Sequence, residues 1–188
     1  MNARVLITSV AILAATLAST LASTAASTED PLISVREADG VYLVSARFSV
    51  PGSPSLAREV LTDYPNIPRF MPDVLTSEVI ERGDGYVRVE QAAVSKYMMF
   101  SKRVRLVLDV EEGADVIRFR DRSHESFELY EGSWTIGTQE SVTLLTYELT
   151  AKPAFSVPGF VLRKLLNRDA HIMIDRLGAE IGARAQQE

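Results

Sequence analysis

Chemically active side chains gather in one short stretch, "RFRDRSHESFELY" at residues 118–130. Asp121, His124, Glu128 and Tyr130 are of residue types that act as general acids and bases in enzymes. The "HESFE" segment lacks the second histidine of an HExxH motif, and the whole chain has only two histidines. We therefore expect no metal site here, and acid–base chemistry is the catalytic route that this stretch offers.

Other catalytic signatures are missing from the sequence. It contains no cysteine, which removes thiol nucleophiles, thiolate metal ligands and disulfides. It also lacks a nucleophile-elbow serine, a phosphate-binding loop and a dinucleotide fingerprint, so we expect no cofactor. Glu128 and Tyr130 keep an enzyme possible, because strict alternation along a strand places them on the same face as Trp134.

The arginines of the same stretch indicate how its strand faces. Arg118, Arg120 and Arg122 alternate with Ile117 and Phe119. A row of charged side chains is typical of the solvated face of a half-buried sheet, where it pairs with acids on adjacent strands. We therefore expect the arginines to lie outside and Phe119 to face the interior.

The first 26 residues, "MNARVLITSVAILAATLASTLASTAA", have the layout of a secretory signal peptide. One charge, Arg4, precedes an apolar stretch that thins into small residues, which favours cleavage after Ala26. The protein would then be periplasmic or secreted. The alternative is a retained membrane anchor, because the uncharged run from Val5 to Thr28 is long enough to span a bilayer.

The rest of the chain has the size of one domain with its own core. Residues 27–40 are expected to form a lead and the first strand of a hairpin, and residues 41–186 the main domain. The chain carries a formal net charge of −5 and no long basic block. This balance argues against nucleic acid as a partner, because neutralising phosphates is what drives such binding.

The periodicity of the chain predicts an α+β fold. Short turns join the strands in sequence, which indicates antiparallel pairing. We expect a curved antiparallel sheet of about seven strands (β-α-α-β6-α) wrapped around a long C-terminal helix. The predicted elements are a hairpin over 32–50 that turns at Asp39-Gly40, a helix capped by Ser53, a short helical turn within 65–72, six strands over 74–152 with the last turn at 137–140, and a helix from Pro158.

The segment between Pro65 and Pro72 combines helix-breaking residues with large apolar ones. The prolines fix the backbone, so the chain can bend there, yet Phe70 and Met71 favour burial. We interpret this segment as a wall or lid of an internal cavity. The alternative is a connector whose side chains simply pack on the edge of the sheet.

A single helix covers a curved sheet incompletely, which leaves space between the two. The lining would come from the inward side chains of the strands and the apolar stripe of the helix. That stripe consists of Leu162, Leu166, Ala170, Met173, Leu177 and Ile181. The predicted ligand-binding residues are Phe70, Met71, Val89, Met98, Phe119, Trp134, Tyr147, Leu162, Leu166 and Met173.

Three of these residues have two interpretations each. Trp134 could border a ligand or be a core residue that closes one end of the sheet. Tyr147 faces inward with its neighbours in the alternation, so its hydroxyl needs a partner on the ligand or on the protein. Met98 suits an adaptable pocket and equally suits a gap in the core.

The sequence resembles the START-like (SRPBCC) superfamily with the helix-grip fold, the Bet v 1 relatives. The similarity is greatest to the coenzyme-Q-binding and polyketide cyclase/dehydrase branch. It rests on "VYLVSARFSVPGSPSLAREVLTDYPNIPRFMPDV" at 41–74, "FSKRVRL" at 100–106, "EGSWTI" at 131–136 and "LLNRD" at 165–169. The resemblance implies binding of a hydrophobic small molecule such as a quinone, lipid, sterol or polyketide. A signal peptide departs from the intracellular relatives of this branch.

These observations favour a non-catalytic carrier of a hydrophobic small molecule or lipid. An aromatase/cyclase-type enzyme is the alternative, and an envelope interaction module with a filled core is a third hypothesis. Arg163, Lys164 and Arg168 lie beside Phe160 and Val161, which could support transient contact with anionic lipid; a solvated helix face explains them as well. The pattern does not define the oligomeric state.

Overall fold

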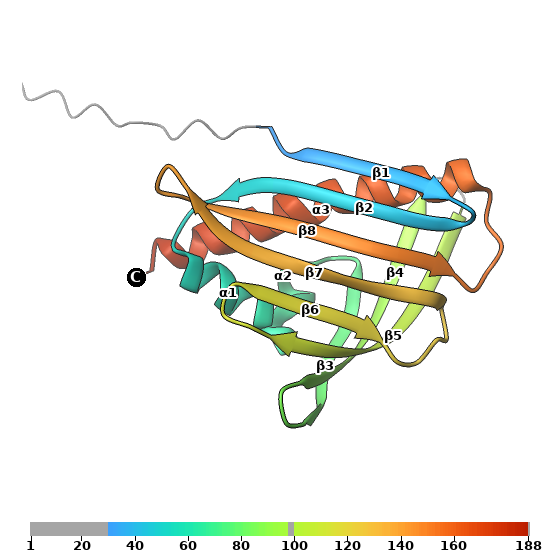
Figure 1. Cartoon of the computed structure of the whole chain (residues 1–188), viewed down its shortest axis with the longest axis horizontal. Helices are drawn as coiled ribbons and strands as arrows, with labels where there is room; N and C mark the ends of the chain where they lie inside the picture. The colour runs from blue at the N-terminus through green and yellow to red at the C-terminus, as the bar shows by residue number, and fades with distance from the viewer. Residues whose placement is uncertain (1–29, 98–99, 188) are drawn as a thin grey trace, which may run out of the picture.

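The computed structural model of the chain describes residues 30–97 and 100–187, in which strands and helices follow the predicted order. Figure 1 shows this arrangement. The elements are β1 (Leu32–Ala38), β2 (Val41–Val50), α1 (Pro54–Thr62), η1 (Tyr64–Asn66), α2 (Ile67–Phe70), β3 (Val74–Arg82), β4 (Val87–Tyr97), β5 (Phe100–Glu112), β6 (Val116–Asp121), β7 (Phe127–Gln139), β8 (Val142–Pro153) and α3 (Gly159–Ala185).

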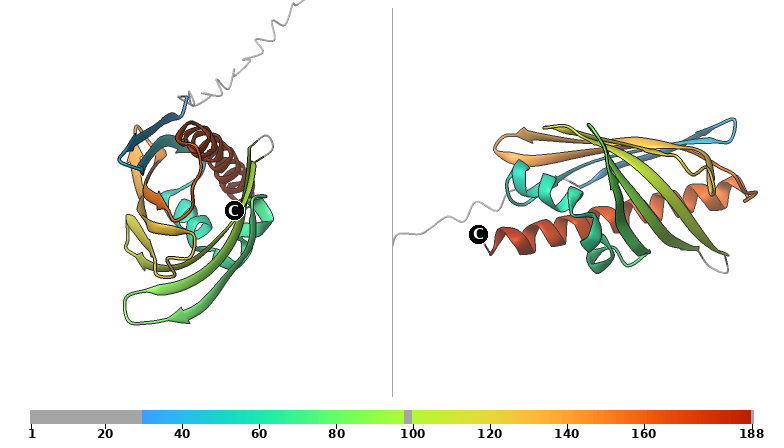
Figure 2. Two further views of the ribbon diagram at one scale, coloured as in Figure 1. Left: turned by 90° about the vertical axis from the view of Figure 1, so that its right-hand side faces the viewer. Right: turned by 90° about the horizontal axis from the view of Figure 1, so that it is seen from below.

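The strands form one antiparallel sheet in the order β1-β2-β8-β7-β6-β5-β4-β3. The sheet curls around α3, which lies along its concave side (Figure 2). The helix-grip prediction is confirmed. The sheet has eight strands, one more than expected, because both arms of the N-terminal hairpin pair within it, from Leu32 opposite Arg47 to Ala38 opposite Val41.

Two tight turns illustrate how local sequence fixes the strand register. Asp39 and Gly40 both have positive φ (53° and 76°), as a two-residue hairpin turn requires. The last turn lies later than predicted: Gly137 is inside β7 opposite Leu144, and the chain reverses at Glu140 and Ser141. These two residues adopt positive φ values (50° and 68°) although neither is a glycine. The prediction placed the turn at Gly137 because glycine adopts positive φ most readily.

The helix α1 begins as its sequence indicates. The Ser53 hydroxyl accepts a hydrogen bond from the Leu56 amide (3.1 Å), and Pro54 occupies the first turn, where its missing N–H is no loss. Leu56, Ala57 and Val60 are buried against the core. This packing places the end of α1 beside the proline-rich segment that forms η1 and α2.

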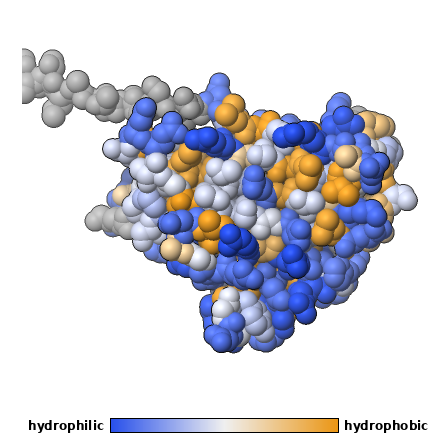
Figure 3. All heavy atoms as spheres, viewed as in Figure 1, coloured by the Kyte–Doolittle hydropathy of each residue, from blue (hydrophilic) through white to orange (hydrophobic). Residues whose placement is uncertain are grey.

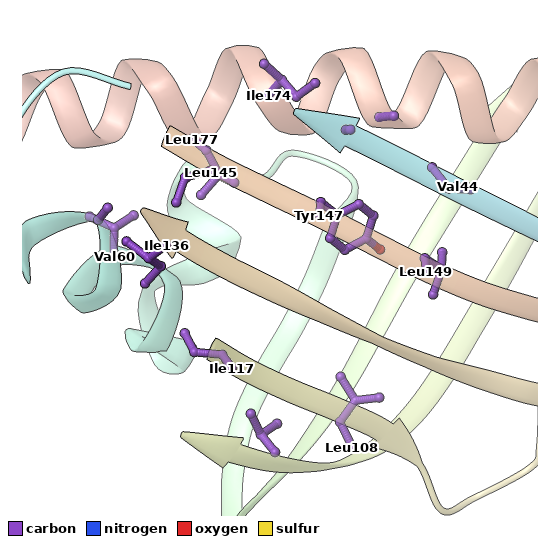
Figure 4. Close-up of a cluster of buried hydrophobic side chains, with 14 of the residues drawn as sticks. Val44, Val60, Leu108, Ile117, Ile136, Leu145, Tyr147, Leu149, Ile174 and Leu177 are labelled. Carbon is purple, nitrogen blue, oxygen red and sulfur yellow. The ribbon is translucent and has the colours of Figure 1, made fainter. Parts of the chain in front are cut away.

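The core lies between the inner face of the sheet and α3 (Figure 4). Side chains alternate between buried and more exposed along β2 and β8, which is the pattern of a sheet with one covered face. On α3 the buried stripe is broader than predicted and includes Leu165 and Ile174. Leu166 and Met173, which we expected in that stripe, are only half-buried.

The convex face of the sheet is the solvated one. In Figure 3, hydrophilic side chains cover much of the visible face, with apolar ones between them. Arg118, Arg120 and Arg122 are exposed there, as predicted, and two of them pair with acids of neighbouring strands. Arg120 Nε is 2.8 Å from Glu131, and Arg122 Nε is 3.6 Å from Asp109.

Candidate ligand-binding cavity

A cavity of about 370 Å³ lies between the concave face of the sheet and α3. This volume falls in the range of pockets that hold small molecules, roughly 300–1,000 Å³. Its lining is mostly aliphatic and aromatic, and side chains from β2, the α1–α2 region, β4 to β8 and α3 all contribute. Such a lining favours an apolar occupant, because burial of apolar surface is the main source of affinity.

Nine of the ten predicted ligand-binding residues surround this one cavity. They are Phe70, Met71, Val89, Phe119, Trp134, Tyr147, Leu162, Leu166 and Met173. Met98 lies outside the described residues. Binding by these side chains remains a prediction, but the structure brings them together from six different elements. The half-burial of Leu166 and Met173 now has a reason, since both face open space instead of packed core.

Sequence reasoning missed part of the lining. Val104, Leu106 and Leu108 on β5 contribute one row, and Leu165 and Ile172 contribute from α3. The signal for the β5 row was present, because these residues alternate with Arg103, Arg105 and Val107. The alternation of side chains between the two faces of a strand could have identified the β5 residues once its inner face was assigned.

A row of aromatic rings forms one wall of the cavity. Trp134 meets Phe48 edge-on (centroids 6.4 Å apart) and lies 4.5 Å from the Tyr147 ring. Tyr147 stacks on Phe119 at 6.2 Å, and Phe119 is 6.0 Å from Tyr130. Trp134 therefore packs against the core and also lines the cavity, and its contact with a ligand stays a prediction.

Gly132 makes this wall possible, because it lies opposite Phe119 on β6 and Leu149 on β8. A Cβ at this position would be 2.6 Å from the Phe119 ring and 2.1 Å from the Glu148 carbonyl oxygen. Any larger residue would have to displace the ring or the neighbouring strand.

Tyr130 and Tyr147 place two hydroxyls within the apolar wall. The two hydroxyls interact with each other, so Tyr147 has a polar neighbour within the protein. Burial raises the pKa of both phenols above the usual value. Both are therefore protonated at neutral pH and can donate as well as accept hydrogen bonds.

The predicted lid consists of η1 and α2. At its start, the Tyr64 hydroxyl donates to a carboxylate oxygen of Glu112 at the end of β5 (2.8 Å). Phe70 and Met71 line the cavity, and Pro72 lines it while also being exposed to solvent. We therefore expect the cavity to open to solvent beside Pro72, where the lid meets β3 and α3.

A second, smaller hollow of about 300 Å³ lies on the outside of the lid. It shares Phe70 and Pro72 with the main cavity, and its other walls carry charged side chains from α2 and α3. Its lining residues are Arg69, Phe70, Pro72, Arg176, Ala179 and Glu180. Phe70 thus separates an apolar interior from a polar outer groove.

The candidate acid–base residues do not converge on the cavity. Asp121 is 1% exposed, and its carboxylate accepts hydrogen bonds from the Val107, Ser123 and His124 amides. It holds the loop after β6 together. His124 itself is exposed, with a positive φ of 53°.

The prediction that Glu128 shares the inward face of Trp134 is wrong. The β7–β8 register shifts between Phe127 and Leu129, so strict alternation fails at this end of β7. Glu128 is exposed and forms an ion pair with Lys152. Tyr130 is the one member of the original group of four that lines the cavity.

The described ranges contain neither a metal-binding cluster nor a membrane-spanning helix. Within residues 30–97 and 100–187, no three His, Asp or Glu side chains are grouped so that they could hold a metal ion. In the same ranges, no helix has both the length and the apolar character needed to cross a membrane.

A curved antiparallel sheet around a C-terminal helix, with an apolar cavity between them, defines the START-like, helix-grip class of proteins. The chain belongs to the polyketide cyclase/dehydrase and lipid transport family, whose model matches residues 50–177. A comparison with curated protein sequences found no match.

Solved structures with the same fold come from distant relatives. A Thermus thermophilus protein is similar with a TM-score of 0.65 and 22% identity, covering 76% of this chain and 99% of its own. The aromatase/cyclase ZhuI from a Streptomyces species is similar with a TM-score of 0.63 and 18% identity, covering 77% of this chain and 95% of its own. A STAR-related lipid transfer protein fragment from Xanthomonas axonopodis is similar with a TM-score of 0.58 and 16% identity, covering 79% of this chain and 98% of its own. At these identities the likeness supports the fold.

Proposed function

We propose that the protein is an exported, non-catalytic carrier of a hydrophobic small molecule such as a quinone, lipid or polyketide-like compound. The observation that carries this proposal is the apolar cavity of about 370 Å³ between the sheet and α3. Burial of apolar ligand surface contributes about 25 cal/mol per Å² before ordering costs, so a ligand that fills the cavity gains affinity without any charged contact.

The positions of the acid–base side chains support a carrier over an enzyme. Asp121 stabilises a loop, and His124 and Glu128 lie on the surface. Tyr130 is the one of these four in the cavity wall, and burial raises its pKa away from the range useful for acid–base catalysis at neutral pH.

An aromatase/cyclase-type enzyme is the second candidate, because Tyr130 and Tyr147 could orient or protonate a keto group in the same cavity. The family description covers cyclases and dehydrases as well as lipid transport, and ZhuI is an aromatase/cyclase of similar fold. Conversion of a poly-keto substrate that disappears in Tyr130→Phe would favour this candidate. A complete lack of turnover by a protein that binds the substrate would favour the carrier.

Export rests on the N-terminal pattern of small and apolar residues, with cleavage after Ala26. Mass determination of the mature protein from its own cells tests this part. A mass that begins at Ser27 supports export, and a mass that includes residues 1–26 supports the membrane anchor.

Ligand exchange would use the opening beside Pro72, with the lid as the moving part. The start of α3 would touch the membrane during loading. Phe160 is 65% exposed there, next to the exposed cations Arg163 and Lys164. An apolar side chain flanked by cations suits the surface of an anionic bilayer. Sedimentation with anionic and with neutral vesicles tests this contact, which Phe160→Asp should weaken.

The carrier proposal is tested by native mass spectrometry of the mature protein purified from its own cells. A bound apolar species is expected, and Phe70→Asp and Trp134→Ala should reduce its occupancy. Leu43→Asp is the matched control, because Leu43 is 45% exposed on β2 and does not line the cavity. A ligand-free protein that takes up neither quinones nor lipids would contradict the proposal.

A further inference from the structure

The paired hydroxyls of Tyr130 and Tyr147 form a polar spot inside the apolar wall of the cavity. Tyr147 is held between the rings of Trp134 (4.5 Å) and Phe119 (6.2 Å). Tyr130 is held between Phe119 (6.0 Å) and Phe127 (4.9 Å). All five side chains line the cavity, so the spot faces the space that a ligand would fill.

The pair has one hydrogen-bond donor more than it uses. Two phenols carry two O–H groups, and their interaction with each other can occupy only one of them, whichever ring donates. Among the residues that the structure describes, neither hydroxyl has a second hydrogen-bond partner. A ligand that enters the cavity displaces water from this spot, so it must supply an acceptor or leave the O–H unsatisfied, which is costly in an apolar site.

The charges near this spot favour an uncharged acceptor. Asp169 lines the cavity, and beside the effect of burial the negative charges of Asp121 and Asp169 raise the pKa of Tyr130. Asp121 is tied into its loop, and Asp169 is paired with Arg168 (3.1 Å). A carboxylate or phosphate placed at Tyr130 would be repelled by both acids and would also lose its hydration. A carbonyl or alcohol oxygen carries neither penalty.

Lys102 is the cation among the described residues of the cavity lining, and it lies on β5 rather than on β7 or β8. Its ammonium group lies 4.5 Å above the Phe155 ring, in the segment that joins β8 to α3. An acidic ligand head would therefore be expected at Lys102, and a neutral oxygen at the tyrosine pair.

We propose that the ligand is an uncharged, largely apolar molecule whose carbonyl or hydroxyl oxygen accepts a hydrogen bond from the Tyr130–Tyr147 pair. This inference rests on the proposed carrier function and narrows its ligand class. It predicts that a neutral ligand is preferred over a fatty acid, and it places the oxygen of the ligand against β7 and β8 and its apolar body toward β4, β5 and α3.

The test compares three ring compounds of similar size by equilibrium dialysis: menadione, which has two ketone oxygens, methylnaphthalene, which has none, and naphthoate, which is charged. The decisive variant is Tyr130→Phe/Tyr147→Phe, because either single variant leaves one phenol whose proton can turn to the ligand. Tyr86→Phe is the control, since Tyr86 donates to Glu81 on the surface and does not line the cavity. The chain has a single tryptophan, so the fluorescence of Trp134 reports that the cavity wall is intact in each variant.

We expect the double variant to bind menadione about three- to tenfold more weakly, the equivalent of one net hydrogen bond, and methylnaphthalene as well as before. Naphthoate should bind most weakly to the wild-type protein. Unchanged menadione affinity in the double variant, or tighter binding of naphthoate than of menadione, would overturn the inference and leave the carrier function standing. Failure of all three compounds to bind the wild-type protein would overturn the carrier function as well.

Discussion

Arg184, near the end of α3, fastens the base of the lid to the rest of the molecule. Its guanidinium donates to Asp63 (2.7 Å), which directly precedes η1, and to Glu180 (2.8 Å), and it lies 3.4 Å from Glu59. Asp63 also accepts a hydrogen bond from Asn66 within the lid (2.8 Å). Removal of the guanidinium leaves three acids close together without their shared cation.

The expected loss in the free energy of unfolding follows from how deeply this cluster of charges is buried. The side chain of Arg184 is 20% exposed and that of Asp63 is 22% exposed. Exposed ion pairs contribute about 0–1 kcal/mol, and breaking a fully buried pair costs about 3–5 kcal/mol. Arg184→Met, which keeps the apolar stem, should therefore lower the free energy of unfolding by about 2 kcal/mol. A loosened lid should also release ligand faster.

Urea unfolding and ligand release kinetics measure the two effects, with Arg36→Met on the exposed part of β1 as the control. Burial alone would raise the pKa of Asp63, but the hydrogen bonds from Asn66 and Arg184 outweigh it and lower that pKa. The stabilisation is thus fully present above the unfolded value of about 4 and is lost as the pH falls through the lower folded pKa. A urea midpoint and a ligand release rate in Arg184→Met that equal those of the wild-type protein would refute the reasoning. So would a free energy of unfolding that depends on acid pH in the same way in both proteins.

Three further substitutions test separate parts of the structure. Val104→Trp should fill the cavity and abolish ligand uptake with little loss of thermal stability, because the new ring enters open space; a large drop in Tm would indicate packed core instead. Gly132→Ala should destabilise the protein by about 1–3 kcal/mol in urea, whereas Gly137→Ala on the same strand, with no atom near its Cβ position, should change little; equal effects would contradict the close packing at Phe119. Asp121→Ala should cost about 3 kcal/mol or more because several amide donors lose their acceptor, and ligand affinity measured on the folded fraction should not change.

Periodicity made most of the architecture predictable. Alternation along the strands and the Asp39-Gly40 turn defined the hairpin, and Ser53 and Pro54 defined the start of α1. The inward set that follows from alternation also located the cavity lining, because a strand has only two faces. One helix against one curved sheet was therefore enough to place most of the candidate site.

The errors arose where the chain departs from regular geometry. The register shift near Phe127 turns Glu128 outward, and no residue type in that segment signals it. The turn at Glu140 and Ser141 uses non-glycine residues with positive φ, so the glycine at 137 was a misleading marker. The partner of Tyr147 also escaped prediction, because it depends on how β7 and β8 aim two side chains across Gly132.

The identity of the ligand could not be predicted for a different reason. Affinity in an apolar cavity depends on shape and volume, which result from how several elements pack together. Leu106, Leu166 and Phe119 are ordinary core residues by type, and only their positions make them a cavity wall.

The most direct test of the central claim is a crystal structure of the mature protein purified from its own cells. The account predicts continuous electron density for a non-protein molecule between the ring of Phe119, the indole of Trp134 and the side chain of Leu166. An interior filled by protein side chains, with no space between the sheet and α3, would contradict it.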